Sequence, residues 1–257
     1  MPAFLLNMIW HANIVMSRSL KRRDHRWMQS NRIKVAIDGP AGAGKSTVAR
    51  IVADKLGYVY VDTGAMYRAI TWHLMDQKID AAESERVLSA LNRVKLALKP
   101  SSGGQQIWID SQEVTDFIRT SAVTRQVSLV AQIPSVRQYL TSIQKQLSAA
   151  GGIVMDGRDI GTAVLPEAEL KIFLTASVEE RAERRYREMQ AAGTAVDLDQ
   201  LMQDIAERDR MDEQREVSPL RKAQDAVYVD CTSMTIDEVV DHIVSLSLSI
   251  INGAMSD

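Results

Sequence analysis

One segment constrains the fold of this chain more than any other: Gly39-Pro40-Ala41-Gly42-Ala43-Gly44-Lys45-Ser46-Thr47. It fits the pattern G-x-x-x-x-G-K-[ST], in which glycines let successive backbone N–H groups wrap a polyphosphate at the positive end of a helix. An apolar run suited to a buried strand, Ile33 to Asp38, precedes the segment, and apolar residues at helical spacing follow it as far as Leu56. The order of strand, loop and helix predicts a nucleoside triphosphate site and disfavours a glycine-rich turn in an unrelated fold. In such a site the Lys45 ammonium reaches the terminal phosphates and the Ser46 hydroxyl ligates magnesium.

The composition limits the remaining classes of protein. The chain has 257 residues, of which 46% are hydrophobic and 25% charged, enough to bury a full core in one domain with insertions or in two small domains. Its net charge of -2 gives no broad attraction to nucleic acid or to an anionic membrane, so we expect neither partner. The single cysteine, Cys231, excludes an intramolecular disulfide. We therefore expect a reduced, cytoplasmic protein, with Cys231 in the core and without a catalytic role. Nothing in the sequence suggests an obligate partner, so we also expect a monomer.

Residues 1–30 differ from the rest of the chain. An apolar start, Met1 to Met16, is followed by a basic stretch from Arg18 to Arg26. The apolar part is too short and too interrupted by polar residues for a spanning helix, and its charges follow it, whereas in a secretory signal they come first. We expect an extension outside the fold, either disordered or upstream of a true start at Met28. An interfacial helix or a targeting segment is the alternative.

From residue 31 onward, short apolar runs alternate with helical patterns. After Ile33 to Asp38 the runs are Tyr58–Asp62, Ile153–Asp156, Leu170–Leu174 and Ala226–Asp230. With the phosphate loop, this alternation predicts an α/β protein of the P-loop NTPase fold, a five-stranded parallel sheet with helices on both faces. Two helices begin with the pattern of a capping box, at Ser177 to Glu180 and at Thr235 to Glu238.

One region breaks the alternation. Two strand-like runs, Val94–Lys99 and Gln106–Ile109, flank the turn signal Pro100 to Gly104. Helical patterns follow at Arg119–Ile133 and Ser135–Ala149. We expect a small antiparallel insert over about 94–134, of the kind that brings a second substrate to a nucleotide-binding core.

Arginines gather on two later helices. Arg181, Arg184 and Arg185 share one helical face, and Arg208, Asp212 and Arg215 share another. Because phosphoryl transfer needs positive charge around the moving group, we interpret these helices, joined by Ala191 to Thr194, as a hinged lid over about 177–216. The alternative is a pair of solvated surface helices that carry ion pairs such as Glu180 with Arg184.

Five segments together resemble the bacterial cytidylate kinases: IDGPAGAGKST at Ile37–Thr47, DTGAMYR at Asp62–Arg68, IPSVR at Ile133–Arg137, DGRDIGT at Asp156–Thr162 and ERDRMDEQR at Glu207–Arg215. Each alone indicates no more than a P-loop kinase, but their order and spacing are specific. The resemblance implies transfer of the γ-phosphoryl group of ATP to CMP or dCMP, with Mg2+, in pyrimidine nucleotide metabolism. It divides the nucleoside monophosphate kinase domain, residues 31–257, into a core (about 31–62, 150–176 and 224–252), a monophosphate-binding region (about 63–149) and the lid.

The resemblance also implies roles for individual residues. Lys45, Asp156, Arg158 and Arg184 act on the transferred group, and Ser46, rather than Thr47, holds Mg2+ together with Asp156. The acceptor monophosphate is held by Arg68, Arg158 and Arg215, with Thr63 and Tyr67 at the mouth of that site. Asp159 accepts from the cytosine amine, Ser128 and Arg137 donate to the base, and Arg208 and Asp212 contact the sugar.

Several of these residues have ordinary structural alternatives. Asp156 can cap a turn at the end of its strand, Ser128 has apolar neighbours on a helix, and Asp159 can pair with Arg158 or a lid arginine. Two other functions also remain open: another small-molecule P-loop kinase, similar to adenylate or shikimate kinase, or a non-catalytic nucleotide-dependent switch. Another kinase of this kind would lack the insert together with the DGRDIGT segment. A non-catalytic switch would not need an arginine-rich lid.

Overall fold

The structure is a computed structural model, which describes residues 32–101, 104–191 and 193–253. The expectations for residues 1–30 concern a part of the chain outside these ranges. Among the described residues, no helix is both long enough and apolar enough to cross a membrane.

Five strands form the central sheet, in the order β2-β6-β1-β7-β8, and every neighbouring pair is parallel. They are β1 (Lys34–Asp38), β2 (Val59–Asp62), β6 (Ile153–Gly157), β7 (Leu170–Thr175) and β8 (Val227–Asp230). The central strand β1 is buried from Val35 onward, which explains its continuous apolar run. The predicted five-stranded parallel sheet is confirmed.

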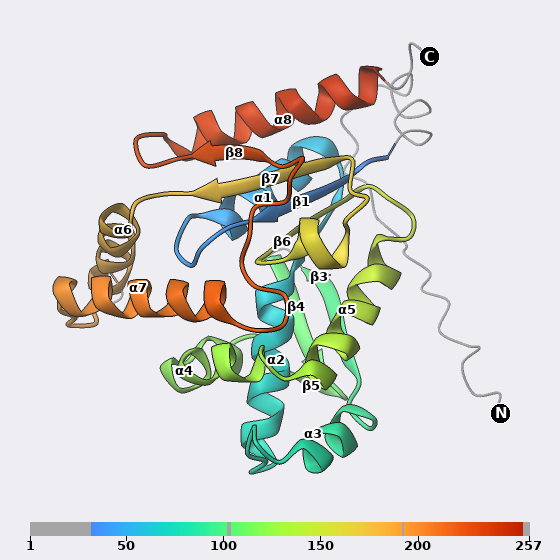
Figure 1. The fold of residues 1–257 in the computed structure, drawn as a ribbon, viewed down its shortest axis with the longest axis vertical. Helices are drawn as coiled ribbons and strands as arrows, with labels where there is room; N and C mark the ends of the chain where they lie inside the picture. The colour runs from blue at the N-terminus through green and yellow to red at the C-terminus, as the bar shows by residue number, and fades with distance from the viewer. Residues whose placement is uncertain (1–31, 102–103, 192, 254–257) are drawn as a thin grey trace. The chain divides into compact units, whose positions relative to one another are not determined.

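Helices follow these strands along the chain. They are α1 (Lys45–Leu56), α2 (Thr63–Asp76), α6 (Val178–Ala191), α7 (Leu198–Gln214) and α8 (Ile236–Gly253), with a π-helical turn, η2, at Ile160–Val164. Figure 1 shows α6 and α7 beside the carboxyl ends of the sheet strands, on the side where the phosphate loop joins β1 to α1. Ligands of open parallel sheets bind at this edge.

The two predicted capping boxes form to different extents. At the start of α8, Thr235 Oγ1 accepts from Glu238 N at 3.3 Å and the Glu238 carboxylate accepts from Thr235 N at 2.8 Å, so this box is complete. At the start of α6, Ser177 Oγ accepts from Glu180 N at 3.2 Å. The return bond is replaced, because Ser177 N donates to Thr232 Oγ1 at 3.0 Å.

The region between α2 and β6 holds a second sheet. Its elements are α3 (Ser84–Leu91), β3 (Leu96–Ser101), β4 (Gly104–Ile109), β5 (Gln112–Glu113), the 3-10 turn η1 (Phe117–Arg119), α4 (Ser121–Val130) and α5 (Pro134–Ser148). The three strands pair antiparallel in chain order. The predicted turn over Pro100 to Gly104 is too long, because Pro100 pairs with Gln105 and Ser101 with Gly104.

The helix predicted over Arg119–Ile133 is wrong at both ends. Its first residue belongs to η1, and α4 begins after Thr120, whose hydroxyl accepts from Val123 N at 3.4 Å as an N-cap. The helix ends at Val130. Two other elements, β5 and α3, were not predicted, and β5 consists of two exposed polar residues, which leave no alternating pattern to detect.

The insert also covers one edge of the main sheet. Because β2 is an edge strand, its outer backbone groups have no strand partner. Gln105 on β4 supplies one: its Oε1 accepts from Asp62 N at 3.2 Å and its Nε2 donates to Tyr60 O at 3.0 Å. One amide side chain thus replaces a strand where the chain leaves β2 for α2.

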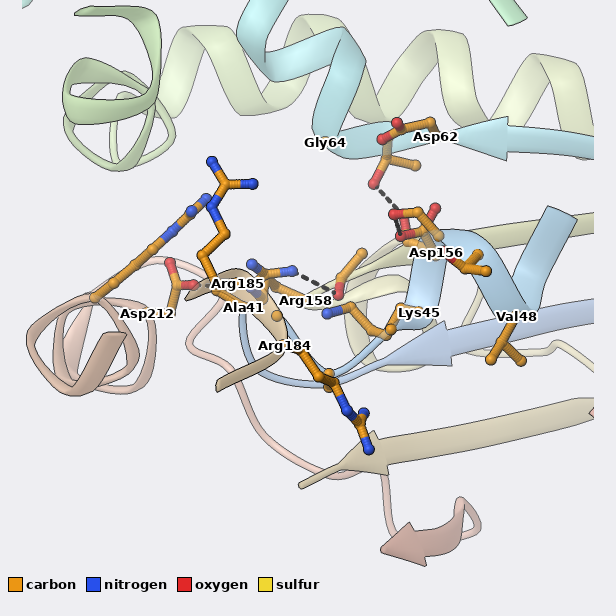
Figure 2. A pocket seen from close by; sticks show the side chains of 18 of the residues that line it. Ala41, Lys45, Val48, Asp62, Gly64, Asp156, Arg158, Arg184, Arg185 and Asp212 are labelled. Carbon is orange, nitrogen blue, oxygen red and sulfur yellow. Dashed lines mark hydrogen bonds and ion pairs between the residues drawn. The ribbon is translucent and has the colours of Figure 1, made fainter. Parts of the chain in front are cut away.

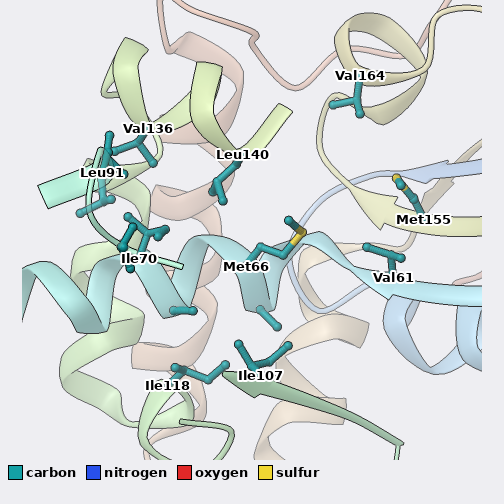
Figure 3. Close-up of a cluster of buried hydrophobic side chains, with 14 of the residues drawn as sticks. Val61, Met66, Ile70, Leu91, Ile107, Ile118, Val136, Leu140, Met155 and Val164 are labelled. Atoms are coloured by element: carbon teal, nitrogen blue, oxygen red, sulfur yellow. The ribbon is translucent and has the colours of Figure 1, made fainter. Parts of the chain in front are cut away.

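The large apolar cluster packs around α2. Figure 3 shows Met66 and Ile70 of α2 between Val136 and Leu140 of α5 on one side and Ile107 of β4 on the other. Each of these side chains is at most 1% exposed. This packing fixes the helix whose first turn lies next to the phosphate loop.

Leu140→Ala should lower the free energy of unfolding by about 2 to 5 kcal/mol, because truncating a fully buried leucine leaves a cavity. Leu147→Ala is the matched control on the same helix; its side chain is 42% exposed. It should cost at most about 1 kcal/mol. Urea denaturation measures both values, and equal losses would contradict the orientation of α5.

Candidate active site

The phosphate loop has the backbone that the motif predicts. Gly42 (φ 77°) and Gly44 (φ 84°) are left-handed, a conformation that glycine adopts without strain. Such a loop turns backbone N–H groups toward an anion at the start of α1. Lys45 is buried, and its Nζ donates to Pro40 O at 2.6 Å, across the loop. Burial and then the neighbouring Arg158 hold the pKa of Lys45 well below its usual value.

Two of the predicted loop residues serve the shape of the loop. Gly39 (φ 147°) lies so close to β7 that a Cβ there would be 1.9 Å from Leu174 O. Gly39 and Pro40 do not line the cavity described below, whereas residues 41–47 all do. The sequence motif therefore combines residues that face a ligand with residues that hold the loop on the sheet.

Asp156 lies at the carboxyl end of β6, against the phosphate loop. Its Oδ2 accepts from Ser46 Oγ at 2.7 Å, and its Oδ1 accepts from Tyr60 OH at 2.9 Å. Thr63 Oγ1 donates to the backbone O of Asp156 at 2.6 Å. Burial and then repulsion from Asp62 raise the pKa of Asp156 to about 6. Asp156 is a carboxylate held between two hydroxyl groups, not a turn cap.

Asp38, at the end of β1, holds the neighbouring loop in place. Its carboxylate accepts from Ile160 N at 2.8 Å and from Gly161 N at 2.7 Å. Burial raises the pKa of Asp38 to about 6. These bonds fix the segment that carries Arg158 and Asp159. Asp38 was not among the predicted site residues, although a carboxylate directly before the first glycine of the loop was an available signal.

A cavity of about 690 Å³ opens from the phosphate loop. Every residue predicted to bind the second substrate lines it: Thr63, Tyr67, Arg68, Ser128, Arg137, Arg158, Asp159, Arg208, Asp212 and Arg215. Figure 2 shows Lys45 and Arg158 between Asp156 on one side and Asp212 on the other. The fold thus brings residues of α2, α4, α5, α7 and the loop after β6 to the phosphate loop.

Asp159 and Arg137 face each other where α4 and α5 border the cavity. Arg137 Nη2 and Asp159 Oδ2 form a buried ion pair, and Arg215 Nη2 lies 3.7 Å from Asp159 Oδ1. Arg137 also donates to Ala131 O at 3.0 Å, and its guanidinium lies 5.5 Å from the centre of the Tyr67 ring. One carboxylate therefore has two arginine neighbours from different elements.

A second group of arginines lies closer to the phosphate loop. Arg158 Nε donates to Asp212 Oδ2 at 2.8 Å, and Arg68 Nη2 lies 4.0 Å from Asp62 Oδ2. Burial and then repulsion from Arg158 lower the pKa of Arg208 to about 10. The Nε atoms of Arg68 and Arg208 are buried and have no hydrogen-bond partner among the described residues. Neighbouring like charges with unused donors suit an anionic ligand.

The three arginines predicted on one face of α6 have different surroundings. Arg184 lines the cavity, pairs with Glu180 at 2.8 Å and donates to Cys231 O at 2.9 Å. Arg185 lines the cavity as well. Arg181 is buried behind the phosphate loop and does not line the cavity. Arg181 thus meets the phosphate loop, where its Nη1 donates to Ala41 O at 2.9 Å, but from behind and not from the cavity. Helical spacing alone does not tell which part of a face is covered.

Arg215 also differs from its expected position. It lies one residue past the end of α7 with an extended backbone (φ -60°, ψ 140°). It therefore does not continue the helical face of Arg208 and Asp212. It reaches the cavity from the following loop, where its Nη1 lies 3.9 Å from Asp212 Oδ1.

One wall of the cavity was missed by sequence reasoning. It consists of residues around the start of α8: Met234, Thr235, Ile236 and Val239. Cys231 is buried as expected and also lines this wall, with its Sγ 3.5 Å from Ala43 O. The capping box at Thr235 to Glu238 marks the start of a helix but no ligand site, since only the sheet order β1-β7-β8 brings these residues to the phosphate loop.

Oxygen ligands suited to magnesium are present. Ser46 Oγ and Asp156 Oδ2 lie 2.7 Å apart beside the phosphate loop. Protein sites for Mg2+ commonly supply one or two such oxygens and leave the rest to phosphates and water. Within the described ranges, no group of three or more histidine, cysteine or acidic side chains could hold a metal ion by itself. The pair fits an ion that arrives with a nucleotide.

The parallel sheet, the phosphate loop and the arginine-lined cavity beside it define a P-loop kinase. A family profile described as cytidylate kinase matches residues 35–248. The cytidylate kinase of Geobacillus sp. (strain WCH70) is 52% identical over 216 residues, which cover 84% of this chain and 96% of that protein. That of Geobacillus kaustophilus is 54% identical over 215 residues, with the same two shares, 84% and 96%. The chain belongs to the cytidylate kinase family.

A further relative shows a similar identity and coverage. The cytidylate kinase of Bacillus anthracis (strain A0248) is 51% identical over 219 residues, 85% of this chain and 97% of that protein. Among solved structures, a gluconokinase from Sinorhizobium meliloti 1021 is 17% identical, and the match covers 88% of this chain and 98% of the gluconokinase chain. Its TM-score of 0.45 is too low to carry a conclusion.

The pH dependence of stability should reveal the buried carboxylate of Asp156. Its folded-state pKa of about 6 lies above the ordinary 3.8, so ionised Asp156 destabilises the fold above pH 6, and this cost fades as the pH falls toward 4. Asp156→Asn has no such charge. The unfolding free energy of the variant minus that of the wild type should be larger at pH 8 than at pH 5 by on the order of 1 to 2 kcal/mol. Chemical denaturation of both proteins at the two pH values, without nucleotide and magnesium, measures this change. A stability difference that does not vary with pH would contradict the raised pKa of Asp156.

Proposed function

We propose that this chain transfers the γ-phosphoryl group of ATP to CMP or dCMP, which gives ADP and CDP or dCDP. Membership of the cytidylate kinase family supports the reaction and the acceptor. One observation carries the proposal: a continuous cavity joins the phosphate loop to the buried Arg137–Asp159 pair. Transfer between two nucleotides requires donor and acceptor to be held in line in one enclosed cleft.

On the donor side, the residues of the phosphate loop would bind the triphosphate. Backbone N–H groups of residues 41–47 would donate to its oxygens, and Lys45 would exchange its bond with Pro40 O for the terminal phosphates. Bound Mg2+ neutralises phosphate charge, and Ser46 and Asp156 are the residues that would hold it. The Tyr60 and Thr63 hydroxyls keep Asp156 in place for this role.

On the acceptor side, we assign the monophosphate to Arg68, Arg158 and Arg215. Each of these arginines has a carboxylate neighbour, which is Asp62, Asp212 or Asp159 respectively. A phosphate dianion can take the place of these carboxylates, because it offers arginine the same forked, charge-assisted hydrogen bonds. That exchange would free Asp212, with Arg208, for the sugar and Asp159 for the base.

Cytosine recognition is assigned to Asp159, Arg137 and Ser128. Cytosine offers an amine donor, which a carboxylate can accept, next to two ring acceptors, which an arginine and a hydroxyl can satisfy. Uracil has a carbonyl oxygen in place of the amine and would face the carboxylate of Asp159. We therefore infer a preference for CMP over UMP.

Two further properties can be inferred, namely the compartment in which the protein works and its oligomeric state. We infer that the protein works in the cytoplasm, because its one cysteine is a buried free thiol. We also infer that it works as a monomer, because the reaction proposed here calls on no residue of a second copy.

Lys45→Ala should lower kcat by a few hundredfold, because a preorganised charge next to the transferred phosphoryl group is lost. An assay that couples ADP release to a signal, with ATP, Mg2+ and a panel of nucleoside monophosphates, measures both this loss and the preferred acceptor. Retention of more than about a tenth of the wild-type turnover would show that the loop is not the donor site.

Asp159→Asn should weaken base discrimination. The amide can turn a donor toward the base, so the charge that favours the cytosine amine is lost and the carbonyl of uracil becomes tolerable. The ratio of kcat/KM for CMP to that for UMP should fall by about tenfold to a hundredfold, because a charge-assisted hydrogen bond in a closed site contributes about 1.5 to 3 kcal/mol.

The control for this experiment is Arg68→Ala, which should slow CMP and UMP by equal factors, because a phosphate carries no base identity. Equal slowing of both substrates by Asp159→Asn would instead place Asp159 on the phosphate side. Base recognition would then belong to Ser128 and Arg137.

A further inference from the structure

The buried Arg181 connects three parts of the site that are far apart in the sequence. Its side chain, on α6, is 4% exposed. Its Nε donates to Ala176 O at 2.9 Å and its Nη1 donates to Ala41 O at 2.9 Å. Its Nη2 pairs with Asp209 Oδ2 at 2.6 Å. The end of β7, the phosphate loop and α7 therefore meet at one guanidinium.

The bond to Ala41 sets the direction of a phosphate-binding group. None of the described peptide bonds is cis, so the C=O of Ala41 and the N–H of Gly42 belong to one planar trans unit and point in opposite directions. While Arg181 holds the carbonyl, the Gly42 N–H points away from Arg181, and Gly42 lines the cavity. A cation on the carbonyl also polarises the peptide, which makes its N–H a stronger donor.

Asp209 connects the same guanidinium to the acceptor side of the cavity. Its neighbours on α7, Arg208 and Asp212, line the cavity, whereas Asp209 faces Arg181 and does not. The other carboxylate oxygen of Asp209 is buried and has no hydrogen-bond partner within the described part of the chain. Arg181 thus holds the turn of α7 that presents Arg208 and Asp212.

We propose that Arg181 is a positioning residue that couples occupancy of the phosphate loop to binding of the second nucleotide. A phosphate that accepts from the Gly42 N–H strengthens the bond between Ala41 and Arg181 in return. Because the same guanidinium pairs with Asp209, an Arg181 fixed in place at the loop also fixes the turn of α7 that carries the acceptor residues. By linkage, each nucleotide tightens binding of the other by the same factor. The inference rests on the function proposed above.

The test measures this coupling factor. The dissociation constant of CMP is determined by titration calorimetry with and without a non-hydrolysable ATP analogue and Mg2+, and the ratio of the two constants is the factor. Couplings between sites are typically about 5-fold to 150-fold. We expect a wild-type factor in that range, which Asp209→Asn and Arg181→Lys bring close to one. Asp209→Asn keeps the shape of the side chain, so it decides the question if Arg181→Lys fails to fold.

The matched control is Glu207→Gln, which makes the same chemical change two residues earlier on α7. Glu207 pairs with Arg210 at 2.6 Å on the exposed side of the helix, and neither residue lines the cavity. This variant should keep the wild-type factor.

Three outcomes would overturn the inference. The first is a wild-type factor of one. The second is an unchanged factor in Asp209→Asn, even with a lower melting temperature, since Arg181 would then serve stability alone. The third is failure of CMP to bind the wild-type protein at all, which would overturn the proposed function as well. The first two leave that function standing.

Discussion

Parallel pairing of β1 with β6 is the contact on which the site depends. Ile37 lies opposite Asp156 and Asp38 opposite Gly157, so both strands leave the sheet at the same edge and in step. β1 delivers the phosphate loop there, and β6 delivers Asp156 and the loop after it. Asp38 then accepts two backbone N–H groups of η2 and keeps the two loops side by side. The triphosphate side and the acceptor side are thus joined by the hydrogen bonds of one strand pair and one carboxylate.

Several charges held out of water line the cavity, and the protein neutralises many of them with one another. Arg137 pairs with Asp159 and Arg158 with Asp212, because an unpaired charge in such a place costs several kcal/mol. The raised pKa of Asp156 expresses the same cost. In the reaction proposed here, a nucleotide exchanges these pairs for its own groups: phosphates replace the carboxylates beside arginine, and the sugar and base take the freed carboxylates. The charges of these two ion pairs therefore have partners with or without ligand.

The apolar packing of α2 serves the same site. The helix begins where Asp62 accepts from Ala65 N at 2.8 Å, directly after β2. Met66 and Ile70 enter the core, and Tyr67 packs against that core and also lines the cavity. Arg68, on the other side of the helix from Ile70, lines the cavity as well. Gln105 holds the insert on the edge of β2 just before this turn. The same helix therefore joins the packing of the insert to the positions of Tyr67 and Arg68 in the cavity.

The sequence by itself determined the strand, loop and helix of the phosphate site, the five strands and the family. These signals are local: an apolar run, glycines at fixed spacing and short motifs in a fixed order. Through the family resemblance, the sequence also predicted ten substrate-binding residues, and all ten line one cavity. Only the tertiary structure decided that Arg181 is buried behind the loop, that Arg215 lies beyond its helix and that the start of α8 forms a wall. Helical spacing tells which residues share a face, but what covers that face depends on strands and helices distant in the chain.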